Sequence, residues 1–298
     1  MKERLYPRAS ITPKGEKALR GGHPWVYADE VTSLSAIPQD GTPVDVFSSK
    51  DKYLGTGFYN SHSKIRIRIL SRNANDTFDA AYWERRLRYA VAYRRTVMGE
   101  TDFRCCRLIF GEADGFPGLT VDRFENVLVA QVLSLGTELI RDTLFSSLVT
   151  LLREEFGAVI DTLYLRNDVA IRELEGMESY TGFYTTEGLE LRSETDERAA
   201  SAADGRDFGT TAITENGIQY TVDYVNGQKR AFSWIRSTTA APSVRSARAR
   251  PCWTASPIPV PSASTPQQAE PKEWYRWTFR PTPWPRRRKT LTPTGFRI

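Results

Sequence analysis

The feature that most constrains this chain is an abrupt change of composition near residue 230. Residues 231–298 hold 11 of the 17 prolines and 5 of the 7 tryptophans, and they contain no aspartate. Each proline fixes φ and removes a backbone donor, so a segment this rich in proline cannot sustain a helix or a central strand. We therefore expect the folded part to lie in the first 230 residues, which suffice for about two domains.

The net charge changes from negative to positive at the same position in the sequence. Residues 1–230 carry 29 Lys and Arg against 34 Asp and Glu, a net charge of −5, whereas residues 231–298 carry 12 basic residues against 2 acidic ones, a net charge of +10. The formal charge of +5 therefore comes from the last segment alone. It is no evidence that the folded part is a basic, nucleic-acid-binding body.

Cysteine and histidine usage argues against metal or redox chemistry. Cys105, Cys106 and Cys252 have no metal-ligand spacing, and we expect the adjacent pair to be packing residues in a reducing compartment, with a disulfide or redox role as the alternative. Two histidines, His23 and His62, are too few for a zinc site. The N-terminus lacks an apolar signal segment and no run reaches the length of a membrane span, so we expect a cytoplasmic protein with no membrane partner.

Residues 11–72 show a pattern of short strands separated by tight turns. The expected strands are "VDVFSS", "YLGTGFYN" and "KIRIRILS". The last alternates isoleucine with a basic residue, so one face should enter a core while the other forms a basic ladder of Lys64, Arg66 and Arg68. This ladder is either the solvated outer face of a small barrel or a surface for a phosphate backbone.

Two strings in this region carry a family resemblance. "PKGEKALRGGHPWVYADEV" and "YLGTGFYNSHSKIRIRILS" resemble the N-terminal PUA domain of a family of bacterial methyltransferases that act on large-subunit ribosomal RNA. The resemblance implies an RNA-binding role for Lys14, Arg20, His23, Trp25, Lys64, Arg66 and Arg68. His23 and Trp25 have a second interpretation, as core and turn residues beside Pro24.

The middle of the chain alternates helical and strand patterns. "DAAYWERRLRYAVAYRRTVM" predicts an amphipathic helix, "CRLIFGEADGFPGLTVDRFENVLVAQVLS" predicts three strands joined by turns, and "TELIRDTLFSSLVTLLREEFGA" predicts a second helix. The apolar face of the first helix is expected to hold Trp83, Leu87, Ala90, Val91 and Val97. That of the second helix is expected to hold Leu139, Ile140, Leu144, Leu148, Leu151 and Phe156.

The string "GEADGFPGLTVDR" resembles the central α+β domain of the same family. Its glycines fit turns rather than a dinucleotide-binding loop, because no helix follows them. Its acids Glu112, Asp114 and Asp122 are expected to form turns and cap backbone N–H groups, with paired catalytic carboxylates as the alternative. "LRNDVAIRE" is also similar to the family, and we expect packing or ion pairing from its Arg166, Asp168 and Arg172.

A polar segment, "ETDERAASAADGRDFGTT", is predicted to be a linker before a β-hairpin in "ITENGIQYTVDYVNGQK". In the family, this hairpin opens a Rossmann-like α/β domain that binds S-adenosylmethionine. The family continues with a "KTGFFLDQ"-like segment, a "VLDCFTHTGSF"-like strand and loop, an acid for the ribose hydroxyls, and an Asp-Pro-Pro motif near the target base. These motifs do not occur after Lys229.

We infer a reading-frame shift of one nucleotide at this point. Restoring one base after codon 229 lets the codons through Arg236 read KTGFLLDQ. The same shift can give VLDCFTHTG from Pro251, VDIS near Arg276, and the helix-like NAVAAAAENADANG from Thr282. Third bases were chosen freely, but four blocks appear in the family's order. The alternative is a genuine basic, disordered extension that binds RNA through Arg286, Arg287, Arg288 and Lys289 among tryptophans.

The predicted fold class is mixed, with a small β-barrel-like PUA domain followed by an α+β central domain and a Rossmann-like domain that is begun but not completed. The expected parts are residues 1–73 (PUA), 74–190 (central domain), 191–230 (linker and first hairpin) and 231–298 (out-of-frame or disordered basic tail). The resemblance implies S-adenosylmethionine-dependent methylation of 23S ribosomal RNA at cytosine C5.

We predict that this chain carries the RNA-binding portion, has no catalytic, cofactor-binding or metal residues, and is inactive as translated. Methylation at cytosine C5 requires a cysteine thiolate that adds to C6, and none of the three cysteines is a credible candidate. The alternative is a stand-alone PUA-type RNA-binding protein without catalysis.

Overall fold

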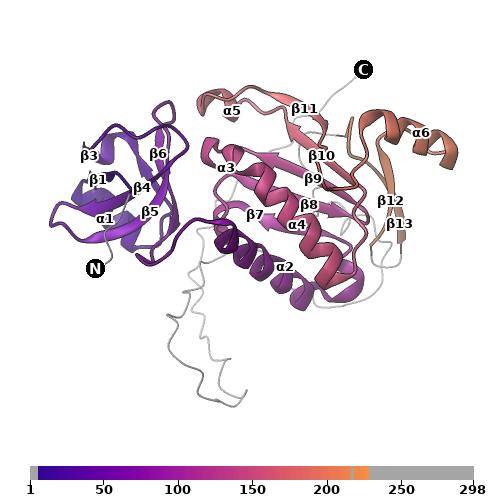
Figure 1. Cartoon of the computed structure of the whole chain (residues 1–298), viewed down its shortest axis with the longest axis horizontal. Coiled ribbons are helices and arrows are strands. Elements are labelled where there is room, and N and C mark those ends of the chain that lie inside the picture. The colour runs from indigo at the N-terminus through magenta and orange to yellow at the C-terminus, as the bar shows by residue number, and fades with distance from the viewer. Residues whose placement is uncertain (1–5, 216–217, 228–298) are drawn as a thin grey trace, which may run out of the picture. The chain divides into compact units, whose positions relative to one another are not determined.

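The computed structural model describes residues 6–215 and 218–227 (Figure 1). The predicted tail, residues 231–298, lies outside the described residues. Residues 229–236, from which the frameshift hypothesis starts, also lie outside them. The described elements form a six-stranded sheet, a five-stranded sheet with its helices, and a two-stranded hairpin.

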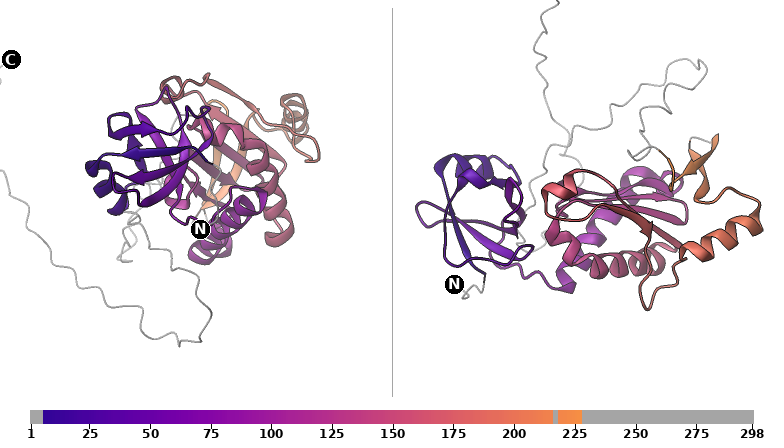
Figure 2. Two further views of the ribbon diagram at one scale, coloured as in Figure 1. Left: turned by 60° about the vertical axis from the view of Figure 1, so that its left-hand side comes forward. Right: turned by 90° about the horizontal axis from the view of Figure 1, so that it is seen from above.

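The first sheet has the strand order β2-β6-β5-β4-β1-β3 and curls around its own core (Figure 2). Its strands are β1 (Arg8–Ile11), β2 (Trp25–Tyr27), β3 (Val31–Leu34), β4 (Pro43–Ser48), β5 (Tyr53–Tyr59) and β6 (Ile65–Ser71). Strands β4, β5 and β6 are the three strands that the sequence predicted, and β1 runs parallel to β4 while the other neighbours are antiparallel. Ile67 and Ile69 enter the core of this sheet, as the alternation in β6 predicted.

Helix α1 (Pro13–Arg20), which the strand pattern did not predict, follows β1. The hydroxyl of Thr12 accepts a hydrogen bond from the backbone N–H of Gly15, and Pro13 occupies the first turn. An N-cap oxygen and a proline in the first turn are the usual signals of a helix start. A short 3-10 helix, η1 (Ala28–Glu30), connects β2 to β3.

The second sheet has the order β11-β10-β9-β8-β7, in which only the β9–β10 pair is parallel. Its strands are β7 (Cys105–Phe110), β8 (Leu119–Phe124), β9 (Val127–Val132), β10 (Thr162–Asn167) and β11 (Tyr180–Phe183). Strands β7 to β9 confirm the predicted run of three strands. Short helical segments η2 (Gly111–Asp114), α3 (Leu135–Leu139) and α5 (Ile171–Leu174) lie in the connections.

Helices α2 (Ala80–Asp102) and α4 (Arg141–Phe156) lie together on one face of this sheet (Figure 1). Trp83, Leu87, Ala90 and Val91 are buried in the shared core, as predicted. Val97 is exposed because it lies one turn after the exposed Tyr93 on the same side of α2. The predicted second helix is divided, since Ile140 leaves helical geometry at φ −108° and ψ 7°. Leu139 therefore lies outside the core and is exposed.

The adjacent cysteines lie on opposite faces of the second sheet. Successive side chains on a strand point to opposite sides, so Cys106 enters the core beneath the helices while Cys105 enters a separate cluster beneath the hairpin. Both side chains are buried in apolar clusters, which confirms the predicted packing role.

The segment predicted to be a linker contains helix α6 (Glu194–Asp204). Ser193 and Asp196 form a capping box at its start, and Gly205 ends it at φ +64°. The predicted hairpin follows as β12 (Thr210–Glu215) paired with β13 (Ile218–Asp223). Ile213 and Val222 of the hairpin pack against the sheet face that carries Cys105.

Candidate nucleic-acid interface

Two of the predicted RNA-binding residues lie on α1, Lys14 in its first turn and Arg20 in its last, and they differ in their availability. Lys14 is exposed, and its amine lies 3.9 Å from a carboxylate oxygen of Asp29. Arg20 is half exposed and forms an i,i+4 ion pair with Glu16 at 2.9 Å. An exposed pair of this kind contributes little stability, so both side chains remain accessible to another anion.

An aromatic cluster forms around β2. The ring centroids of His23 and Trp25 are 5.5 Å apart, and those of Trp25 and Tyr27 are 6.5 Å apart, both edge to face. The backbone N–H of Trp25 donates to Nδ1 of His23, and the indole Nε1 donates to Glu112 at 2.9 Å. The indole edge is therefore bonded inside the protein. Tyr27, which the sequence analysis did not single out, lies at the exposed edge of this cluster.

The basic ladder on β6 is graded from exposed to buried. Lys64 is exposed, and Arg66 is half-buried and donates to the carbonyl of Asn60 at 2.9 Å. Arg68 is buried. The ladder therefore presents its first member, and part of its second, to solvent.

The prediction that all three residues of the ladder are exposed is wrong for Arg68. Its guanidinium donates to Glu112 at 3.1 Å and to Glu175 at 2.8 Å, and Glu175 is itself buried. Glu175 also accepts from Ser63 at 2.5 Å and Asn60 at 3.1 Å. A buried charge needs a partner and satisfied hydrogen bonds, so Arg68 belongs to these internal contacts and is not part of an exposed phosphate-binding surface.

The three acids around "GEADGFPGLTVDR" are held in internal contacts. Asp114 forms two hydrogen bonds to Arg94, at 3.0 and 2.6 Å, and accepts the backbone N–H of Phe110 at 2.7 Å. Asp122 pairs with Arg107 at 2.7 and 3.0 Å. With Glu112 bonded to Trp25 and Arg68, capping and ion pairing account for these acids, and a catalytic carboxylate pair does not.

The residues predicted to pack or pair in "LRNDVAIRE" do so. Arg172 is buried and donates to the carbonyls of Val132 and Glu178 and to the carboxylate of Glu138. Arg166 lies 3.6 Å from a carboxylate oxygen of Asp168 and donates to the carbonyl of Gly227 at 3.1 Å. Arg166 thus fixes the end of the hairpin to the second sheet.

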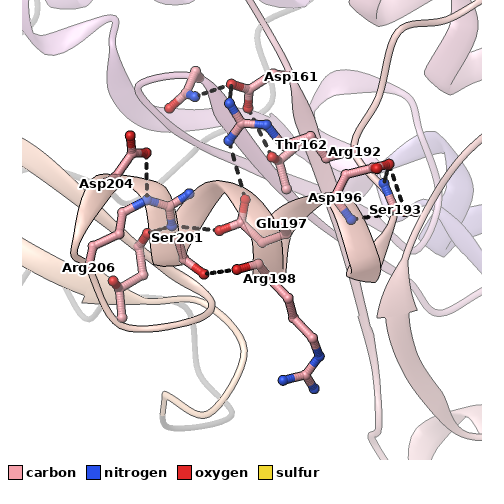
Figure 3. Close-up of polar contacts among 12 residues, drawn as sticks. Asp161, Thr162, Arg192, Ser193, Asp196, Glu197, Arg198, Ser201, Asp204 and Arg206 are labelled. Carbon is pink, nitrogen blue, oxygen red and sulfur yellow. Dashed lines mark hydrogen bonds and ion pairs between the residues drawn. The ribbon is translucent and has the colours of Figure 1, made fainter.

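A second polar cluster, which the sequence analysis missed, surrounds α6 (Figure 3). The buried carboxylate of Glu197 receives hydrogen bonds from Arg206 at 2.5 Å and from Arg192 at 3.2 Å, and Arg192 also pairs with Asp161 at 2.9 Å. Burial opposes the charge of Glu197, but the hydrogen bond and charge of Arg206 outweigh it, so the pKa of Glu197 is lowered. The Ser193 and Asp196 capping box, visible in the same view, was the sequence signal that could have located this helix.

Two hollows lie on the described surface. One, of about 200 Å³, is lined by the α6 cluster, where the arginines are already compensated by acids. The other, of about 570 Å³, lies along β11 and residues 184–186. A Rossmann-type S-adenosylmethionine site needs a glycine-rich loop after a parallel strand, and within residues 6–215 and 218–227 neither hollow offers one. That part of the chain also contains no cluster of metal-ligating side chains and no helix able to cross a membrane.

Comparison with known proteins shows which proteins this chain resembles. The family described as "PUA-like domain" matches residues 10–72. The "Ribosomal RNA large subunit methyltransferase I" of Klebsiella pneumoniae (strain 342) is 35% identical over 232 residues, which is 78% of this chain and 52% of that protein. The protein of the same name from Alteromonas mediterranea is 32% identical over 222 residues, 74% of this chain and 50% of that protein. The chain is a homologue of ribosomal RNA large subunit methyltransferase I.

The chain spans about half the length of the methyltransferase I relatives it matches. Two solved structures share its fold. A candidate SAM-dependent methyltransferase from Streptococcus mutans has a TM-score of 0.51 at 17% identity and covers 72% of this chain and 48% of that one. A candidate methyltransferase complexed with SAH has a TM-score of 0.52 at 16% identity, covering 72% and 47%. The predicted family resemblance, the mixed fold class and S-adenosylmethionine as the family's cofactor are confirmed.

Proposed function

We propose that residues 1–230 are the RNA-holding portion of an S-adenosylmethionine-dependent enzyme that methylates cytosine C5 in 23S ribosomal RNA. The observation that carries the proposal is the similarity to proteins named ribosomal RNA large subunit methyltransferase I over 74% to 78% of this chain. Within residues 1–230, we assign residues 1–73 to a PUA domain and 74–190 to a central domain. We assign residues 191–230 to the linker and first hairpin of the catalytic domain.

The proposed RNA surface consists of Lys14, Arg20, His23, Trp25, Lys64 and Arg66. The exposure of Lys14 and Lys64 supports phosphate contacts, since accessible amines can replace the counterions of an RNA backbone. The aromatic cluster around Trp25 supports contact with unpaired bases.

The test is a paired charge removal in the full chain. Lys14→Ala combined with Lys64→Ala should weaken binding to a fragment of large-subunit ribosomal RNA and flatten the salt dependence of log K by about 0.7–0.9 per lost phosphate contact. The control, Lys50→Ala combined with Lys52→Ala, removes two exposed lysines from the β4–β5 turn of the same domain. Equal effects of the two pairs on affinity and salt slope would contradict the assigned surface.

The catalytic part of the proposal concerns residues beyond the hairpin. We propose that β12 and β13 open a Rossmann-like domain whose continuation is out of frame after Lys229, so that the chain as translated neither binds S-adenosylmethionine nor methylates. The absence of the family's cofactor motifs from the sequence after Lys229 supports this. Calorimetry of the full chain with S-adenosylmethionine is expected to give no micromolar binding, and micromolar affinity would contradict the inactive state.

Resequencing the DNA from codon 225 past codon 298 tests the frame directly. An extra base near codon 229, with a restored frame that reaches an Asp-Pro-Pro motif, would make the protein a complete methyltransferase. DNA that stands as translated would favour the second candidate, a stand-alone RNA-binding protein.

A further inference from the structure

One flank of α2 exposes aromatic rings to solvent. Tyr89 is 61% exposed and Tyr93, one turn later, is 42% exposed, while Leu87 and Val91 on the opposite side are fully buried. Phe110, at the end of β7, is 49% exposed. We name Tyr89, Tyr93 and Phe110 the α2 aromatic surface. Single exposed apolar residues are ordinary on a soluble protein, but three exposed aromatic rings on α2 and on the end of the contacting strand β7 indicate an interaction site.

Two arginines without acidic partners border these rings. Arg85 and Arg86 lie one turn before Tyr89, and neither forms an ion pair within residues 6–215 and 218–227. Arg85 lies over the ring of Tyr82 at 5.5 Å. Arg86 packs its guanidinium against the backbone of Gly115, so close that a Cβ at that glycine would lie 1.8 Å from Nη2. Arg88, by contrast, pairs with Glu155 on the side of α2 that faces α4.

Two rings of the α2 aromatic surface, Tyr93 and Phe110, have supporting contacts beneath them. The guanidinium of Arg94 lies 5.2 Å from the ring centroid of Tyr93 and forms two hydrogen bonds to Asp114. Asp114 accepts the backbone N–H of Phe110, and Arg107 lies 5.3 Å from the Phe110 ring. One buried ion pair therefore lies beneath both Tyr93 and Phe110.

The same supporting segment contacts the proposed PUA surface. Helix η2 carries Glu112, which accepts the indole N–H of Trp25, and it is followed by Gly115, which contacts Arg86. The aromatic cluster around Trp25 and the α2 aromatic surface are thus joined through five consecutive residues, 111–115.

We infer that the α2 aromatic surface binds unpaired RNA nucleotides by stacking, with Arg85 and Arg86 contacting the adjacent phosphates. Every base has a π-face, so exposed rings bordered by arginine suit single-stranded RNA without a requirement for sequence. The charge favours RNA over an apolar protein partner, because a protein helix docking on the rings would leave two arginines uncompensated. This inference rests on the proposed function and assigns it a second binding surface.

The test compares full-length variants for binding to a single-stranded RNA and to a duplex of the same length, by fluorescence anisotropy near physiological salt. Tyr89→Leu combined with Tyr93→Leu should weaken single-strand binding by about tenfold or more and leave duplex binding within twofold, given the usual contribution of one stacked base. The matched variant Tyr89→Phe with Tyr93→Phe keeps both rings and should bind like the unchanged protein. The Leu variants keep apolar bulk at exposed positions, and circular dichroism checks their fold.

Arginine variants test the phosphate contacts. Arg85→Ala should weaken binding and reduce the salt slope, whereas Arg153→Ala, which removes an exposed arginine from α4, should not. Cross-linking to RNA that carries 4-thiouridine, followed by peptide mapping, should give adducts in residues 80–102. The mapped position distinguishes binding at this surface from binding by residues 231–298.

The outcomes distinguish this inference from the proposed function. If the Leu pair binds single-stranded RNA as the unchanged protein does, while the pair at Lys14 and Lys64 loses binding, the α2 inference is overturned and the proposed function stands. If the unchanged protein binds neither RNA, both are overturned. Weakened binding by the Phe pair equal to that of the Leu pair also overturns stacking as the mechanism.

Discussion

Arg68 of β6 donates a hydrogen bond to Glu175, which directly follows α5, over 2.8 Å, and both side chains are buried. Glu175 also binds Asn60 and Ser63 of the first sheet's last loop. Charged and polar groups, rather than apolar packing alone, therefore join the first sheet to the loop after α5. This requires each of these buried groups to keep its partner.

We expect Glu175→Ala to destabilise the protein by about 3–5 kcal/mol, because it leaves a buried guanidinium with a single partner and removes acceptors from Asn60 and Ser63. The exposed pair between Arg88 and Glu155 is the control, and Arg88→Ala should cost about 0.2–1 kcal/mol. Urea denaturation of the full chain, followed by tryptophan fluorescence, measures both. Similar midpoints for the two variants would mean that the Arg68 contact contributes no more than a surface ion pair.

Glu197 should be as critical to α6 as Glu175 is to the first sheet. Glu197→Ala leaves Arg192 and Arg206 facing a buried position without their shared acceptor, and we expect a loss of about 3–5 kcal/mol. The same helix provides a matched control, because Glu194 forms an exposed i,i+4 pair with Arg198 that is worth about 0.3–0.5 kcal/mol.

Hydrogen exchange read out on peptides of α6 and of the hairpin tests this prediction. Faster exchange in both elements is expected for Glu197→Ala and not for Glu194→Ala. If exchange accelerated only within α6, the ion pairs would stabilise the helix without anchoring the hairpin to the sheet.

Strands β4 to β9 and the main helix, α2, were predictable because their signals are local. Alternation in β6 and the 3.6-residue period in α2 each follow from the residues of the element itself. The burial of Arg68 was not predictable from such local signals. An alternating strand shows that its two faces differ, but not whether the polar face meets water or the buried carboxylate of Glu175, more than a hundred positions away.

Helix α6 was missed for a different reason, since the sequence signals of its start and end were present. Ser193 and Asp196 have capping-box spacing, an alanine-rich stretch follows, and Gly205 provides the left-handed C-terminal residue. Low apolar content suggested a linker, because the helix is stabilised mainly by charges. Its key contacts come from Arg192 and Arg206 just outside its ends, where an apolar-period search does not look.

Cys106 should be chemically inert in the folded protein. Burial raises the pKa of its thiol to about 12, because the thiolate would lose hydration in the core beneath α2 and α4. The thiolate is the reactive form, so we expect no alkylation of Cys106 by iodoacetamide at pH 8 and complete alkylation in urea. Peptide mapping by mass spectrometry assigns the modified site. Alkylation of Cys106 in the native protein at a rate like that of a free thiol would show that this core opens readily.

The capping box of α6 should give the helix a dependence on acid pH. The Ser193 hydroxyl and backbone N–H both donate to Asp196, and these hydrogen bonds lower the pKa of its carboxyl. Because the folded pKa lies below the unfolded value of about 3.9, the stabilisation is complete above that value and is lost as pH falls through the folded pKa.

Ser193→Ala should therefore lower the thermal midpoint by a constant amount from pH 6 to 8, through loss of an N-cap worth about 0.5–2 kcal/mol. Below about pH 4 the difference from the unchanged protein should shrink, because protonated Asp196 no longer accepts the Ser193 hydroxyl hydrogen bond as strongly. NMR titration of the Asp196 carboxyl carbon provides a direct measurement, with the pKa expected to rise toward its ordinary value in Ser193→Ala. An unchanged Asp196 pKa in that variant would show that the capping box does not set the charge at the start of α6.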